Sequence, residues 1–95
     1  MEENRVERRL KAQVEKIGGK AYKWVSPGVT GVPDRMVLLP GGTLIFVELK
    51  APGKKLRKIQ EYRAKELRKL GFQVECLDTV EKVDLLLNNV YKFIY

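Results

Sequence analysis

Two acidic residues and a lysine in the middle of the chain have the types and spacing needed to hold a divalent cation beside an amine. Asp34 precedes an apolar segment, and Glu48 and Lys50 stand two residues apart after the apolar run 44–47. In a strand, residues two apart leave the same face, so Glu48 and Lys50 would lie together. Charges at the end of a buried strand are costly unless they are compensated. A cation held by Asp34 and Glu48 would compensate them.

The length of the turn between the two acids decides whether they can share an ion. Residues 36–39 and 44–50 are expected to pair as a hairpin through a turn within 40–43. A two-residue glycine turn would put Asp34 on the wrong face, whereas a three-residue loop or a bulge would put it opposite Glu48. Opposed residues have Cβ atoms about 4.5–5.5 Å apart, close enough for both carboxylates to reach one ion. Alternatively, Asp34 lies just before the regular pairing begins.

Length and composition restrict the possible classes of protein. The 95 residues predict one small domain over 1–95, and the 44% hydrophobic content is enough for one core. The single Cys76 excludes an intrachain disulfide and a thiolate zinc site, and it fits a reducing compartment such as the cytoplasm. The absence of histidine excludes His bases and Ser-His-Asp chemistry. The charged N-terminus and the short apolar runs predict neither a signal peptide nor a membrane span.

Positive charge is concentrated in one part of the chain. Residues 50–69 hold nine basic and two acidic residues and carry the whole net charge of +7. This concentration favours a polyanionic partner, although an ordinary solvated helix face is the alternative. The residues expected to contact the partner are Lys54, Lys55, Arg57, Lys58 and Arg63.

The periodicity of apolar residues predicts an α/β domain in the order α-β-β-β-α-β-α, with a mixed sheet flanked by helices. Helices are expected over 2–18 and 54–70, and strands over 20–25, 36–39, 44–50 and 72–77. Asp78 is expected to cap a third helix, with Glu81 completing a capping box. The apolar tail 91–95 is expected to add a strand or to bury against another subunit.

Two polar residues lie at the borders of apolar helix stripes. Glu7 and Gln60 could each reach toward the end of the hairpin, or each could be an ordinary boundary residue. Trp24 is expected in the core or in a dimer contact. The glycines of the loop 26–31 either allow a close approach to a ligand or make a flexible connector.

The central motif resembles a known group of enzymes. Asp34 is followed by thirteen residues and then by Glu48 and Lys50, which resembles the PD-(D/E)xK nuclease superfamily. More narrowly, Gly31-Val32-Pro33-Asp34-Arg35, Phe46-Val47-Glu48-Leu49-Lys50, Gln60 and Glu7 resemble the motifs of the VRR-Nuc family of virus-type replication-repair nucleases, in its standalone phage-type form. Arg57 departs from the pattern, because relatives often carry a small residue there. The implied fold is a restriction-endonuclease-like core.

The resemblance also implies roles for individual residues. Asp34, Glu48 and the Leu49 carbonyl would bind Mg²⁺ or Mn²⁺, and Lys50 would position or deprotonate the attacking water or offset charge on the phosphorus centre. Glu7 would complete the site, where it could serve a second ion, and Gln60 would orient Lys50 or water.

The implied function is metal-dependent, structure-selective cleavage of branched DNA in repair, including Holliday junctions, by a homodimer. The physical argument agrees, because a metal can activate water and clamp a phosphate. Two other interpretations stay open: a non-catalytic basic DNA-binding module, and an RNA or restriction-type nuclease on the same fold.

Overall fold

The chain forms helices and strands in the predicted order, so the predicted α/β class is confirmed. The computed structural model describes residues 2–94, with only the backbone described at residues 2, 3 and 94. The elements are α1 (Glu2–Lys16), β1 (Lys20–Lys23), β2 (Arg35–Leu39), β3 (Thr43–Leu49), α2 (Lys58–Lys69), β4 (Gln73–Leu77) and α3 (Val80–Ile94). Within residues 2–94, no helix combines the length and the apolar character that crossing a membrane requires.

The four strands form one mixed sheet in the order β1-β2-β3-β4. The two hairpin connections make β1, β2 and β3 antiparallel neighbours. β3 and β4 run parallel, because α2 carries the chain back across the sheet between them. β3 is therefore a central strand, and β4 lies at one edge.

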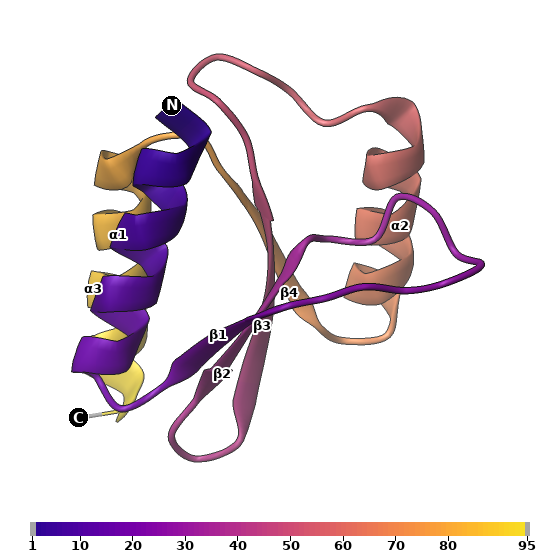
Figure 1. Cartoon of the computed structure of the whole chain (residues 1–95). Helices are drawn as coiled ribbons and strands as arrows, with labels where there is room; N and C mark the ends of the chain where they lie inside the picture. The colour runs from indigo at the N-terminus through magenta and orange to yellow at the C-terminus, as the bar shows by residue number, and fades with distance from the viewer. Residues whose placement is uncertain (1, 95) are drawn as a thin grey trace.

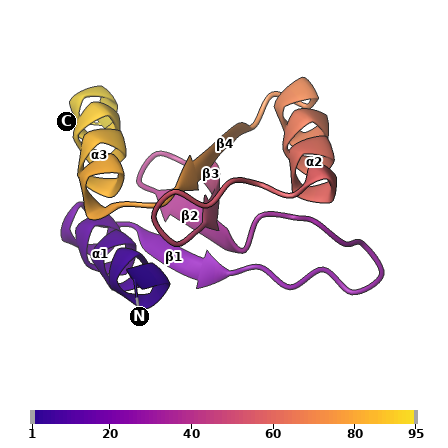
Figure 2. The same cartoon turned by 90° about the horizontal axis from the view of Figure 1, so that it is seen from above.

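Helices cover both faces of the sheet (Figure 1). α1 and α3 pack side by side on one face, and α2 lies on the other, as the view from above also shows (Figure 2). The alternation along β3 assigns its side chains to these layers: Ile45, Val47 and Leu49 enter the core under α1 and α3, whereas Phe46 faces α2. The larger core consists of Val6, Leu10, Val14, Val37, Leu39, Ile45, Val47, Leu49, Leu77, Val83, Leu86 and Leu87.

The core under α2 is smaller and aromatic. Phe46, Ala64 and Val74 are its buried members. Trp24 packs on Phe46 with ring centroids 4.9 Å apart, and Phe72 meets the same ring edge-on at 5.3 Å. Of the two places predicted for Trp24, the core is the one observed.

The direction of the elements gives the molecule two different ends. In Figure 1 the N-terminal ends of α1, α2 and α3 lie at the upper end, together with the C-terminal ends of β3 and β4. The hairpin loop 40–42 lies at the lower end. Helix N-termini carry partial positive charge, so the upper end favours anions.

Three predicted boundaries need correction. α2 begins at Lys58 and not at residue 54, and the preceding residues form a loop. Thr79 and not Asp78 caps α3, because Thr79 Oγ1 accepts a hydrogen bond from the Lys82 backbone N–H at 3.1 Å. Residues 91–94 continue α3 instead of forming a strand, since no Gly or Pro interrupts the helix; Tyr95 lies outside the described residues.

Candidate active site

The hairpin has the three-residue loop that a shared site requires. Leu39 pairs with Thr43 and Arg35 pairs with Val47. Asp34, one residue before β2, therefore falls beside Glu48 at the end of β3. The Leu49 backbone N–H donates to Asp34 Oδ1 at 3.3 Å, which holds this carboxylate against the end of β3.

Glu48 is a buried carboxylate with an incomplete set of partners. It is 7% exposed, and its Oε2 accepts a hydrogen bond from Gln60 Nε2 at 3.2 Å. Lys50 Nζ lies 3.6 Å from the same oxygen. The other oxygen, Oε1, is buried and has no hydrogen-bond partner among the described residues. Burial raises the pKa of Glu48, and the charge of Asp34 raises it further, while Lys50 opposes both effects.

These donors fit a hard divalent cation. Burying a carboxylate oxygen without a partner is costly, and a cation at Oε1 would remove this cost and the repulsion from Asp34. Carboxylate and carbonyl oxygens are the ligands that Mg²⁺ and Mn²⁺ prefer, so the Leu49 carbonyl fits as a further donor. Among the described side chains, no group of three or more His, Cys, Asp or Glu residues could hold a metal ion. The two carboxylates would therefore need backbone oxygen, water or substrate to complete the coordination.

Glu7 reaches the site through an intermediary. Its carboxylate forms an ion pair with Arg35, whose guanidinium is buried under α1. Arg35 Nη1 also donates to the Asp34 backbone carbonyl at 3.0 Å. Glu7 is thus linked to Asp34 through Arg35, and a direct role for Glu7 at a metal stays a prediction.

Gln60 joins the site to the start of α2. Its Oε1 accepts the Arg57 backbone N–H at 2.9 Å, and its Nε2 donates to Glu48. The side chain therefore caps the helix from within and contacts Glu48, and the expected role of Gln60 in orienting Lys50 or water stays a prediction. Arg57 occupies the cap position of α2, where no Ser, Thr, Asp or Asn is present.

The loop before Asp34 is fixed against α2. Gly31 has φ +83°, and a Cβ there would lie 2.7 Å from Ile59, so only glycine fits. Arg63 Nε donates to the Thr30 carbonyl at 2.8 Å. Gly31 thus packs against α2, and Arg63 helps to hold this loop; a contact of Arg63 with nucleic acid stays a prediction.

The remaining predicted nucleic-acid contacts lie in the loop between β3 and α2 and at the start of α2. Lys54, Lys55, Arg57 and Lys58 are exposed and form no ion pair with the described side chains. Asp78 Oδ2 holds this loop by accepting the Gly53 backbone N–H at 3.0 Å. The loop begins directly after Lys50, so its cations border the site.

Two residues near the site were not recognised from the sequence. Arg35 is one. The sequence feature that could have identified it is a charged side chain in phase with the buried Val37 and Leu39 of β2. Cys76 is the other: it is partly exposed, and it pairs with Glu48 in the register of β3 and β4. Burial raises the pKa of Cys76, followed by the charge of Glu48, so the thiol stays protonated. Only the pairing of strands distant in sequence could have revealed this position.

A mixed sheet with a carboxylate pair and a lysine at the end of its central strand defines a nuclease core of the PD-(D/E)xK type. No family model matches the sequence. "Putative nuclease p44" of Acyrthosiphon pisum secondary endosymbiont phage 1 is 50% identical over 84 residues, which span 88% of this chain and 90% of that protein. A solved structure described as a VRR_NUC domain superposes with a TM-score of 0.87 at 32% identity, covering 93% of this chain and 96% of that chain. This chain belongs to the phage-type VRR-Nuc family of nucleases, hydrolases that act on nucleic acids.

Proposed function

We propose that this nuclease is a divalent-metal-dependent, structure-selective DNA endonuclease that cuts branched DNA, including four-way junctions, as a homodimer. The observation that carries the proposal is the buried, unpartnered Oε1 of Glu48 beside Asp34 and Lys50. An unsatisfied buried oxygen next to a second carboxylate is unfavourable for stability alone, and a bound cation would account for it.

Each side chain of the site has a distinct task in this mechanism. A Mg²⁺ or Mn²⁺ ion bound by Asp34, Glu48 and the Leu49 carbonyl would supply water activation and charge neutralisation at the phosphate. Lys50 Nζ would hold the attacking water or donate to a phosphoryl oxygen, where its positive charge offsets charge that develops in the transition state. Gln60 would keep Glu48 in its rotamer during this step.

Arg35 and Glu7 would set the position of Asp34. Arg35 bonds the Asp34 carbonyl, and Glu7 holds the Arg35 guanidinium from α1. Both tasks are positioning tasks, because neither side chain is placed on the two carboxylates. The DNA backbone would lie on Lys54, Lys55, Arg57 and Lys58, which gives affinity without base specificity.

The comparison of substrates tests the proposed reaction. We expect Mg²⁺-dependent nicking of a four-way junction, faster than that of flap, linear duplex or single-stranded DNA, and no cleavage of the matching RNA junction. Faster cleavage of RNA would contradict the choice of DNA, and equal rates on linear duplex would contradict structure selectivity. In the absence of DNA, Mg²⁺ should raise the melting temperature of the wild type but not that of Asp34→Asn.

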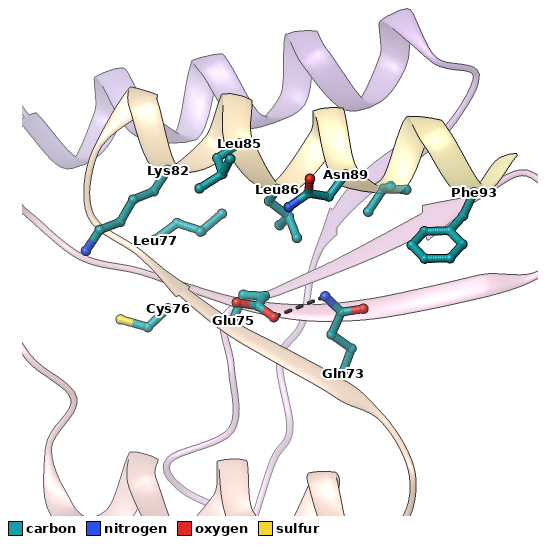
Figure 3. Close-up of a pocket in the computed structure, with 10 residues that line it drawn as sticks. Gln73, Glu75, Cys76, Leu77, Lys82, Leu85, Leu86, Asn89 and Phe93 are labelled. Carbon is teal, nitrogen blue, oxygen red and sulfur yellow. Dashed lines mark hydrogen bonds between the residues drawn. The ribbon is translucent and has the colours of Figure 1, made fainter. Parts of the chain in front are cut away.

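The surface proposed for the homodimer is a groove of about 470 Å³ between the edge strand β4 and α3. Leu85 and Phe93 are 63% and 93% exposed and border it, and Gln73 and Glu75 line its floor (Figure 3). Exposed apolar side chains beside an edge strand are features of an association surface. A second copy placed by a two-fold axis would cover the groove and give two active sites for opposed strands.

A single substitution tests this surface. Leu85→Glu should convert a dimer into a monomer of 10.9 kDa, measured by light scattering. Leu70→Glu is the matched control, because Leu70 is 70% exposed at the far end of α2. A wild type that is monomeric at micromolar concentration would contradict the dimer, whereas an unchanged mass for Leu85→Glu would move the interface elsewhere. Deletion of 91–95 should also weaken the dimer, since Phe93 lines the groove; Tyr95 lies outside the described residues.

A further inference from the structure

A hollow lined by arginines lies between the first turns of α1 and α3, on the opposite side of the site from α2. Its volume is about 490 Å³, and Arg5, Arg8 and Arg9 line it from α1, facing Glu81 and Asp84 of α3. The N-terminal ends of both helices lie at the same end of the molecule as the C-terminal end of β3 (Figure 1). The active site at that strand end therefore has basic groups on either side of it.

The arginine hollow adjoins a second hollow that reaches the loop following Lys50. A smaller hollow is lined by Arg5 and Glu81, which also line the arginine hollow, and by Pro52. Pro52 belongs to the same loop as Lys54 and Lys55. A surface path thus leads from the start of α2, through the loop, to the first two turns of α1.

The arginines of the hollow are not equally available. Arg9 is engaged, because Nε and Nη2 donate to the two carboxylate oxygens of Asp84 at 2.9 and 2.8 Å. The hydrogen bond and the charge of Asp84 raise the pKa of Arg9, and the charge of Glu81 adds to this effect. Arg5 and Arg8 are exposed and form no ion pair with the described side chains.

We propose that Arg5 and Arg8 form a second phosphate-binding track, so that the DNA backbone crosses the active site and continues over the N-terminal turns of α1. The inference rests on the proposed function, since it names where that DNA lies beyond the loop and α2. Arg5 and Arg8 stand three residues apart and share one face of the helix, where Cβ atoms are about 5–6 Å apart. This spacing lets both guanidinium groups contact phosphates of one strand, and guanidinium groups bind phosphate in a bidentate manner.

The test compares two double variants with the same loss of charge. Arg5→Ala with Arg8→Ala should lower affinity for a four-way junction roughly tenfold at 0.1 M salt and reduce the slope of log K against log salt by about 2. Lys16→Ala with Lys20→Ala is the control, because Lys16 ends α1 and Lys20 begins β1. Lys16 lies about 16 Å along the helix from Arg5, beyond the screening length of about 10 Å. Binding is measured without divalent metal, so that cleavage does not intervene.

The outcomes separate this inference from the proposed function. Equal losses in the two double variants would reduce the effect to net charge and overturn the track. Unchanged affinity in the arginine variant would also overturn it, while a loss in Lys54→Ala with Lys55→Ala would leave the proposed DNA path standing. A wild type that binds no DNA would contradict both the arginine track and the proposed function.

A gain of affinity gives an independent test in the opposite direction. Glu81 is the exposed acid of the hollow and forms no ion pair with the described side chains. Glu81→Gln keeps its size and removes its repulsion of phosphate, so affinity should rise about two- to fivefold. A merely structural role for the hollow predicts no gain, and an unchanged affinity would overturn the track.

Discussion

One face of the sheet carries the large core, and the other carries the proposed site. The face under α1 and α3 is apolar apart from Arg35 at the start of β2, and Val37 and Val47 on it are fully buried, as is Leu10 of α1 above them. The face under α2 has only a small aromatic core, and it turns polar at Glu48 and Gln60 where β3 ends. The same strand supplies both faces, because alternate residues of β3 point in opposite directions. The large core therefore holds rigid the strand whose other side carries the proposed site.

Replacing either carboxylate should have the largest effect and should leave the apolar face intact. Asp34→Asn and Glu48→Gln should each lower Mg²⁺-dependent cleavage by at least about 100-fold, because each removes a charged ligand at the reacting phosphate. The fold should persist, as judged by circular dichroism and by the mass in solution. Retained cleavage in either purified variant would contradict the shared site.

Replacing a residue of the large core should lower the stability and leave cleavage almost unchanged. Leu10→Ala should lower the free energy of unfolding by about 2–5 kcal/mol, because it leaves a cavity in a fully buried position. Denaturant unfolding measures this change, and cleavage per folded molecule should stay close to that of the wild type. The matched change on the other face, Leu67→Ala, should cost only about 1–2 kcal/mol, since Leu67 is partly buried. Equal costs would contradict the difference between the faces.

Gln60 contacts the proposed site and also caps α2, so its replacement should lower both the cleavage rate and the stability modestly. Gln60→Ala should lower the cleavage rate about tenfold, with little change in KM, by freeing Glu48. It should also cost about 1 kcal/mol of stability, because the Arg57 backbone N–H loses its acceptor. Gln60→Met is the control for size, and a loss of stability without a loss of rate would reduce Gln60 to a helix cap.

The smallest expected effect is a pH-dependent gain of stability. Burial and the charge of Asp34 raise the pKa of Glu48 above its ordinary value of 4.5, so the folded state binds this proton more tightly than the unfolded chain does. The stability that Glu48 contributes therefore falls as the pH rises from its pKa in the unfolded chain through its raised pKa in the folded state. Without metal, Glu48→Gln should melt at a higher temperature than the wild type at pH 7.5, and the difference should shrink below about pH 4.5. A constant difference across this range would contradict the raised pKa.

Local patterns in the sequence were sufficient for the central hairpin. Alternation predicted the shared face of Glu48 and Lys50, and the requirement that Asp34 oppose Glu48 left a three-residue loop, a bulge or a position before the paired strand open; the structure has the three-residue loop, with Asp34 one residue before β2. The family motifs around Asp34 and Glu48 lie where the geometry needs them. For this part of the site, the deciding contacts are between residues close in sequence or paired across one turn.

Contacts between distant residues were beyond the sequence. Arg35 can be buried because Glu7 pairs with it. Glu7 lies 28 residues earlier, and no local sequence pattern predicts this partner. The loop before α2 stays outside the helix while Asp78, 25 residues later, holds Gly53. The apolar residues after Val90 resembled a strand, yet the helix simply continues, since hydrophobic character alone does not distinguish the two.

The loop 40–42, at the opposite end of the molecule, sets the phase of the hairpin that carries Asp34 and Glu48. Side chains of a strand alternate with a period of two, so adding or removing one residue in this loop would move Asp34 to the other face relative to Glu48. Adding two residues would conserve the phase. What matters for an insertion in this turn is therefore whether the number of added residues is even or odd. An even number keeps the two carboxylates together, and an odd number separates them unless a bulge restores the alignment.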